Sequence, residues 1–78
     1  MNVQAYILVQ TEIGSSGDVV RAIGEIPGVT LAEDVTGPYD VIVRAEAGSM
    51  DDLGRQILAR IQQVPGITRT LTCPVVHL

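Results

Sequence analysis

Apolar and polar positions alternate at the start of the chain and then take up helical spacing, and this change occurs twice. Residues 3–11 alternate, which predicts a strand with one wholly apolar face. That face consists of Val3, Ala5, Ile7 and Val9. After Gly14-Ser15-Ser16-Gly17, apolar residues recur at helical spacing until Pro27-Gly28, so an amphipathic helix is expected between these breaks.

The second half of the chain repeats this order after a hairpin. Residues 29–36 and 39–45 are two predicted strands, and the turn-forming Thr36-Gly37-Pro38 between them predicts a tight hairpin. A second helical stripe ends at Pro65-Gly66, and residues 67–76 form the last predicted strand. The stripe consists of Met50, Leu53, Ile57, Ile61 and Val64.

Each predicted helix begins at a Ser that is followed three residues later by an Asp. The pairs are Ser15 with Asp18 and Ser49 with Asp52. Each pair resembles a capping box, in which the Ser side chain accepts a hydrogen bond from an amide of the first helical turn.

The resulting order of elements is β-α-β-β-α-β, and a short motif marks its two halves. Residues 26–30 (Ile-Pro-Gly-Val-Thr) recur as residues 64–68 (Val-Pro-Gly-Ile-Thr), both at a helix-to-strand junction. This duplication predicts an α+β, ferredoxin-like βαββαβ fold, a four-stranded antiparallel sheet with two helices on one face. Residues 1–78 are expected to form a single domain.

The composition predicts a self-associating protein. Of the 78 residues, 46% are hydrophobic, which is a high share for so short a chain, and one face of the sheet has no helix to cover it. The net charge of −4 and the absence of Lys argue against a nucleic-acid partner bound through a basic patch. The single Cys73 excludes an internal disulfide, and no stretch is long and apolar enough for a membrane span or signal peptide, so a cytoplasmic protein is expected.

Asp40 is the residue that the strand pattern explains least. It stands between the hairpin turn and a run of Val and Ile, where a carboxylate is disfavoured unless it has partners. Those partners are either backbone amides, in which case Asp40 has a structural role, or a bound ligand. Both hypotheses remain open at this point.

The other polar residues predict no catalytic group and no metal site. His77 is the only histidine and stands next to the last residue, where a solvent-exposed end is expected. Cys73 lies in an apolar strand, which predicts a small core residue instead of a nucleophile. Asp51 and Asp52 follow Ser49 at a helix start, where acidic side chains favour the helix dipole.

Three sequence motifs together resemble the RAM domain, the effector-binding and oligomerisation domain of the Lrp/AsnC (feast/famine) transcription regulators. They are Pro-Gly-Val at 27–29, Val-Thr-Gly-Pro-Tyr-Asp-Val at 35–41 and Val-Pro-Gly-Ile-Thr-Arg-Thr-Leu-Thr at 64–72. The resemblance covers essentially the whole chain. Regulators of this family carry an N-terminal helix-turn-helix domain, whereas this chain begins at the first RAM strand, so it looks like a stand-alone RAM domain without direct DNA binding.

The resemblance implies a homodimer whose sheets pack face to face, a dimeric α+β barrel, and larger rings such as octamers. It also implies that an amino acid or a similar small molecule binds between dimers, without any cofactor. The implied ligand-binding residues are Gly37, Pro38, Tyr39, Asp40, Thr70 and Thr72. Asp40 would accept hydrogen bonds from the ammonium group, and turn amides and Thr hydroxyls would donate to the carboxylate.

Two other classes of function stay open, although no enzyme is expected. An enzyme of the dimeric α+β barrel type would place polar catalytic groups inside the barrel, where this chain offers little beyond Tyr6, Tyr39 and Asp40. Acylphosphatase shares the topology but needs an Arg in the first loop and an Asn on a strand. It is excluded, because the only Asn here is Asn2. An adaptor that co-assembles with full-length Lrp-type regulators is the other alternative, and it differs by binding no amino acid of its own.

Overall fold

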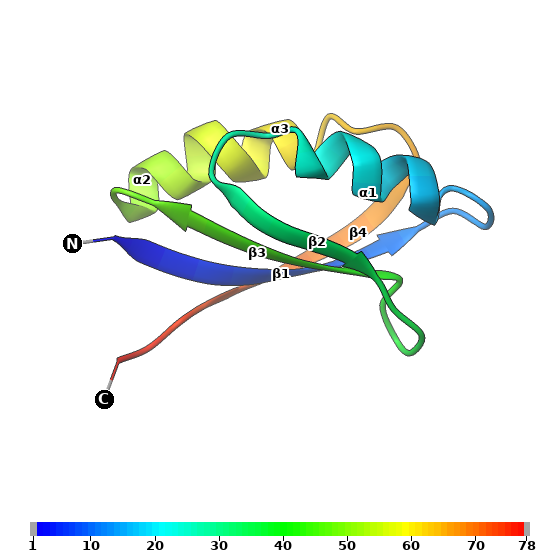
Figure 1. Ribbon diagram of the computed structural model, residues 1–78, viewed down its shortest axis with the longest axis horizontal. Helices are drawn as coiled ribbons and strands as arrows, with labels where there is room; N and C mark the ends of the chain where they lie inside the picture. Colours follow the sequence, from blue (N-terminus) through cyan, green and yellow to red (C-terminus); the bar gives the residue numbers. More distant parts are fainter. Residues whose placement is uncertain (1, 78) are drawn as a thin grey trace.

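The computed structural model describes residues 2–77 and has the element order that the sequence predicts (Figure 1). The elements are β1 (Val3–Thr11), α1 (Ser16–Gly24), β2 (Val29–Asp34), β3 (Val41–Ala47), α2 (Met50–Asp52), η1 (Leu53–Leu58), α3 (Ala59–Ile61) and β4 (Ile67–Pro74). The strands form one antiparallel sheet in the order β2-β3-β1-β4, and the helices cover one of its faces. The α+β, ferredoxin-like prediction is therefore confirmed.

The core lies between the helices and the central strands, and it is wholly aliphatic. The β1 residues with odd numbers and their β3 partners point to the helices, as in the pairs Ile7–Val43 and Val9–Val41. The buried residues are Ala5, Ile7, Val9, Val19, Ile23, Ile26, Val41, Val43, Ala45, Leu53, Ile57 and Ile61. Since the even-numbered residues of β1 point to the other side, the sheet keeps a second face that no helix covers (Figure 1).

The connection between β2 and β3 is longer than the predicted tight hairpin. β2 ends at Asp34 and β3 begins at Val41, so residues 35–40 form a loop. One hydrogen bond, from the Val35 amide to the Asp40 carbonyl (2.9 Å), closes the base of this loop. The Asp40 amide in turn donates to the carbonyl of Val9 on β1 (2.9 Å), so Asp40 joins the loop to both neighbouring strands.

Only one of the two predicted helix caps forms. The Ser49 hydroxyl accepts a hydrogen bond from the Asp52 amide (3.1 Å), as expected. The side chain of Ser15 makes no such bond, so that prediction is wrong. Ser15 has helical backbone angles (φ −98°, ψ −10°), whereas a capping side chain reaches the first turn from an extended backbone such as that of Ser49 (φ −156°, ψ 168°).

The second helix widens into a π-helix between Leu53 and Leu58. Its buried residues Leu53, Ile57 and Ile61 are each four positions apart. In an α-helix of 3.6 residues per turn, such positions drift around the axis by about 40° per step. The wider turn, closed by the Ala59 amide on the Gly54 carbonyl, reduces this drift and keeps the three side chains over the sheet.

The two repeated Pro-Gly turns dock onto the ends of the central strands. The Gly28 carbonyl accepts a hydrogen bond from the amide of Glu46 on β3 (2.8 Å), and the Gly66 carbonyl accepts one from the amide of Glu12, just after β1 (2.8 Å). Both glycines have positive φ, +98° and +95°. A Cβ on Gly28 would lie 2.7 Å from Cδ1 of Ile57, and one on Gly66 would lie 2.9 Å from Cβ of Ser15. The repeated glycine is thus required by backbone geometry and by space.

We predict that Gly28→Ala lowers the free energy of unfolding by about 2–4 kcal/mol, because a left-handed backbone and a steric clash both penalise the added methyl group. Gly54→Ala is the matched control. Its φ is not positive and nothing lies within 4 Å of the added Cβ, so it should stabilise the protein by about 0.5–1 kcal/mol. Urea denaturation measures both values, and equal midpoints for the two variants would contradict this account.

Candidate functional site

The loop of residues 35–40 leaves the sheet on the side away from the helices (Figure 1). Together with the sheet beside it, the loop borders an open hollow of about 520 Å³. The lining consists of Leu8, Val35, Thr36, Gly37, Pro38, Tyr39 and Ile42. Three of the six residues that the resemblance implies, Gly37, Pro38 and Tyr39, therefore gather around one mainly apolar hollow.

Two polar side chains fasten the loop to the rest of the sheet. Gln10 Nε2 donates a hydrogen bond to the Pro38 carbonyl (2.9 Å). Oδ2 of Asp40 accepts one from the Thr11 amide (2.8 Å) and lies 3.5 Å from the Thr11 hydroxyl. Gly37, at φ +150°, supplies a backbone conformation that other residues rarely adopt. The second half of the loop, at Pro38 and Asp40, is thus held by β1.

The structural role considered for Asp40 is confirmed. Its half-buried carboxylate accepts a hydrogen bond from a backbone amide, which explains why a charged residue is tolerated at the start of a strand. The donor, Thr11, is far away in sequence and belongs to β1 instead of the turn itself. Oδ1 makes no hydrogen bond to any atom of residues 2–77, so one oxygen is available to a ligand.

Thr70 and Thr72 lie on the other side of the sheet. They pair with Val9 and Ile7, whose side chains point to the helices, whereas Leu8 in the hollow points away from them. Within one protomer the structure does not bring these threonines to the loop. Thr70 instead lines a smaller, polar hollow of about 260 Å³ together with Gln62, Ile67, Thr68 and Arg69.

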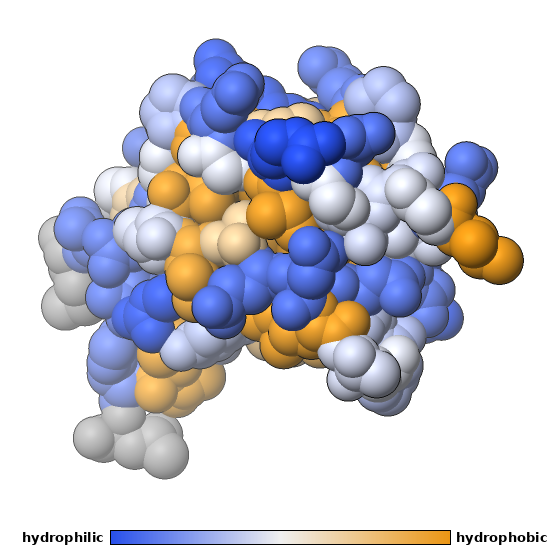
Figure 2. Space-filling view, turned by 45° about the vertical axis from the view of Figure 1, so that its right-hand side comes forward, coloured by the Kyte–Doolittle hydropathy of each residue, from blue (hydrophilic) through white to orange (hydrophobic). Residues whose placement is uncertain are grey.

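The uncovered face of the sheet, which we call the open face, carries exposed apolar side chains from three strands. Tyr6, Leu31 and Leu71 are 38%, 43% and 45% exposed. Leu8 and Ile42 also point to this face and share a register row with Leu71. Figure 2 shows hydrophobic groups on the lower side of the molecule, opposite the helices, with polar groups among them. Cys73 also lies on this face, opposite Tyr6, and is exposed, so its prediction as a core residue is wrong. From Arg69 on, the odd-numbered residues of β4 point away from the helices, whereas Ile67, before the register shift, packs against the core. No apolar pattern along β4 alone reveals this.

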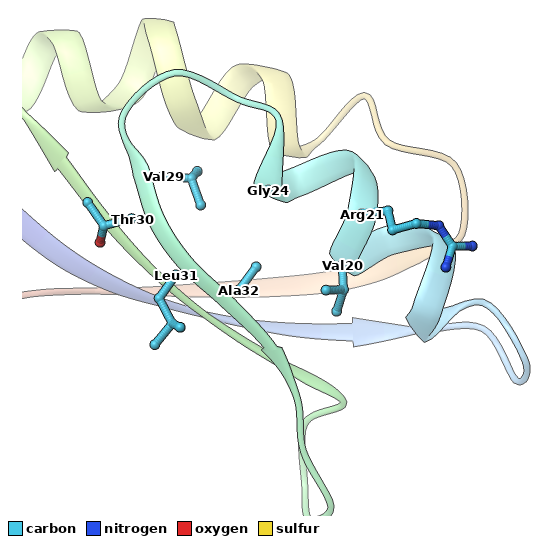
Figure 3. Close-up of a pocket in the computed structure, with 7 residues that line it drawn as sticks. All are labelled: Val20, Arg21, Gly24, Val29, Thr30, Leu31 and Ala32. Atoms are coloured by element: carbon cyan, nitrogen blue, oxygen red, sulfur yellow. The ribbon is translucent and has the colours of Figure 1, made fainter.

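A further hollow, of about 340 Å³, lies between α1 and β2 and was not anticipated from the sequence. Figure 3 shows Val20 extending from α1 toward Ala32 on β2, while the side chain of Arg21 points away from the gap. Arg21 pairs with Asp18 on the surface of α1. The lining therefore offers apolar contact but no group for chemistry.

The described part of the chain holds no group of three or more His, Cys, Asp or Glu side chains that could bind a metal ion. Its helices are also too short or too polar for any of them to span a membrane.

A family model, the Lrp/AsnC ligand-binding domain, matches residues 4–77. The chain belongs to this family. The coarse function of the chain is that of an effector-binding regulatory module.

Curated relatives match this domain with only a part of their own length. A homocitrate synthase from Sulfurisphaera tokodaii is 36% identical over 72 residues, which are 91% of this chain and 15% of the synthase. An uncharacterized HTH-type transcriptional regulator from Pyrococcus furiosus is 24% identical over 71 residues, which are 87% of this chain and 47% of the regulator. The chain thus spans less than half of these relatives.

Solved structures of the same fold cover nearly all of the chain. FFRP-DM1 is 34% identical with a TM-score of 0.88, over 95% of this chain and 99% of that one. TTHA0845 from Thermus thermophilus is 25% identical with a TM-score of 0.90, over 97% and 95% of the two chains. The transcriptional regulator NMB0573 from Neisseria meningitidis, solved as a complex with L-Met, is 19% identical with a TM-score of 0.84, over 96% of this chain and 50% of that one.

We predict that Asp40→Ala lowers the free energy of unfolding by about 1–2 kcal/mol, because the Thr11 amide loses its acceptor. Asp40→Asn keeps an acceptor oxygen at the same place and should lose less than half as much. Urea denaturation of the two variants beside the parent measures the difference. If both variants lost the same free energy, the negative charge and not the hydrogen bond would be the stabilising feature.

Proposed function

We propose that this Lrp/AsnC ligand-binding domain binds a free amino acid at the loop of residues 35–40 and works as a homodimer that joins through the open face. The observation that carries the proposal is the loop itself. Its apolar hollow of about 520 Å³ is lined by Gly37, Pro38 and Tyr39. Asp40, the next residue, is not in the lining, but one of its carboxylate oxygens has no partner within residues 2–77, and neither do the amides of Gly37 and Tyr39.

The polar groups around the loop fit the two charged ends of an amino acid. Oδ1 of Asp40 would accept hydrogen bonds from the ammonium group. The amides of Gly37 and Tyr39 donate to no acceptor in the described part of the chain, so they would bind the carboxylate. An apolar side chain of the ligand would then enter the hollow between Leu8 and Ile42. The relative from Neisseria meningitidis was solved with L-Met, an amino acid of this kind.

The threonines of β4 take part in this proposal through a neighbouring subunit. Thr70 and Thr72 lie on the helix side of the sheet, so a second protomer would have to bring its own threonines to the loop. A ligand site built in this way is complete only in the oligomer, which agrees with a site between dimers in a ring such as an octamer.

An adaptor function is the second candidate. The helix-turn-helix regulator from Pyrococcus furiosus carries a domain similar to this one over about half of its length. A chain with the same open face could pair with such a regulator and bind no ligand itself. In both cases we propose no direct contact with nucleic acid, because the net charge is −4 and the chain has no Lys.

We predict that Asp40→Asn weakens amino-acid binding by about ten- to hundredfold, because a charge-assisted hydrogen bond of roughly 1.5–3 kcal/mol is lost while the fold is kept. A thermal-shift screen of the parent against the twenty amino acids identifies the ligand, and isothermal titration calorimetry then measures both proteins. Asp51→Asn is the matched control, since it removes one negative charge from an exposed helix start far along the chain from the loop. Unchanged affinity in Asp40→Asn would refute the role of this carboxylate, and a parent that binds none of the twenty would favour the adaptor.

We predict that the parent protein forms a dimer at micromolar concentration, because several apolar side chains of the open face are otherwise exposed to water. Light scattering coupled to size-exclusion chromatography measures the mass. Leu71→Glu places a charge among these side chains and should shift the protein toward the monomer, whereas Met50→Glu, an exposed position on α2, should not. A monomeric parent would refute the dimer.

A further inference from the structure

Gln10 fixes one peptide group of the loop of residues 35–40. It lies near the end of β1, directly before the register of β1 with β4 shifts, and its side chain reaches across to the loop. Its Nε2 donates a hydrogen bond to the Pro38 carbonyl (2.9 Å). Pro38 and Tyr39 line the apolar hollow, whereas Gln10 does not. Gln10 therefore holds the loop from outside the hollow.

The bond to Pro38 also orients the amide of Tyr39. The Pro38 carbonyl and the Tyr39 N–H belong to the same planar peptide group, and no peptide bond of residues 2–77 is cis. In a trans peptide the carbonyl and the N–H point in opposite directions. Because the carbonyl points to Gln10, the N–H of Tyr39 points away from Gln10. A side chain of β1 thus sets the direction of a donor that we assign to the ligand carboxylate.

This peptide group has no second hydrogen bond within residues 2–77. Gln10 is the one partner of the Pro38 carbonyl there, and the Tyr39 amide donates to no acceptor. The pyrrolidine ring fixes φ of Pro38, but ψ of Pro38 and φ of Tyr39 can still turn the peptide group between them. If Gln10 lost its N–H donor, the group could rotate, and the Tyr39 amide would no longer keep one direction.

The Asp40 end of the loop is held by the backbone instead. The Asp40 carbonyl accepts a hydrogen bond from the Val35 amide (2.9 Å), and the Asp40 amide donates one to the Val9 carbonyl (2.9 Å). Oδ2 of Asp40 accepts one from the Thr11 amide (2.8 Å). The acceptor for the ligand ammonium group is therefore fixed by backbone groups, whereas the donor for the ligand carboxylate depends on one side chain.

We propose that Gln10 is a positioning residue of the amino-acid site, which aims the Tyr39 amide at the ligand carboxylate without touching the ligand. This role depends on the amino-acid binding proposed above and adds the residue that makes the site select a carboxylate. A ligand with an ammonium group but no carboxylate should bind independently of Gln10. A hydrogen bond that only stabilised the loop would affect both kinds of ligand equally.

Gln10→Met tests this role, because Met has a similar length but no N–H to donate. The probes are L-Met, the amine left when its carboxylate is removed and the acid left when its ammonium group is removed. If the screen of the twenty amino acids identifies another ligand, its own amine and acid take their place. Isothermal titration calorimetry should show about three- to tenfold weaker binding of the amino acid and the acid to Gln10→Met, and unchanged binding of the amine. Asp40→Asn should weaken the amino acid and the amine but not the acid.

NMR spectroscopy tests the orientation of the peptide group without a ligand. The three-bond coupling between the amide and α protons of Tyr39 reports its φ, and this coupling should change in Gln10→Met because the peptide group rotates. Gln56→Met is the matched control, since Gln56 is exposed on η1, on the helix side of the sheet. It should change neither the coupling nor any of the affinities.

The outcomes separate this role from the proposed site. Gln10→Met binding the amino acid as tightly as the parent, or losing the same factor for the amine, would overturn the positioning role. An unchanged Tyr39 coupling would overturn it as well, since the peptide group would then be oriented without Gln10. In these cases amino-acid binding at the loop would stand. A parent that binds none of the twenty amino acids would instead remove the proposed site and the role of Gln10 together.

Discussion

The antiparallel ladders of β1 with β3 and β4 join the two halves of this domain, and two further backbone hydrogen bonds fix the helix ends to the sheet. Each Pro-Gly turn lies at the end of one helix, and its glycine carbonyl accepts a hydrogen bond from an amide at the end of a central strand of the other half. The Gly28 carbonyl accepts from the Glu46 amide, and the Gly66 carbonyl accepts from the Glu12 amide. The helices consequently lie across the β1–β3 pair, and the core forms between them. Only glycine allows this close approach with positive φ, which gives the repeated motif its physical meaning.

The elements themselves could be predicted from the sequence because their signals are local. Alternation over residues 3–11 gave β1 with both of its ends, and the Pro-Gly pairs marked where each helix stops. The errors arose where a distant part of the chain decides. Asp40 bonds to Val9 and Thr11 of β1, and Cys73 faces away from the helices because it pairs with Tyr6 on β1. No pattern within a window of a few residues contains these contacts.

The candidate site was predictable in part for the same reason. Gly37, Pro38 and Tyr39 are neighbours in sequence and so gather around one hollow. Thr70 lies on a different strand, and the face it occupies depends on its register with β1. A family resemblance names the residues of a site without saying which copy of the chain supplies each one. The strand register supplies this information, because Thr70 pairs with Val9 and therefore points to the helix side, away from the loop of its own chain.

The hollow and the open face are physically one surface. Leu8 and Ile42 line the hollow and also point to the open face, where their register row is next to that of Tyr6 and Arg44. A ligand in the hollow and a second copy on the open face would therefore contact the same two side chains. If the ligand changes the affinity of the two copies for each other, dimerisation must change the affinity for the ligand by the same factor, because the coupling free energy belongs to both equilibria.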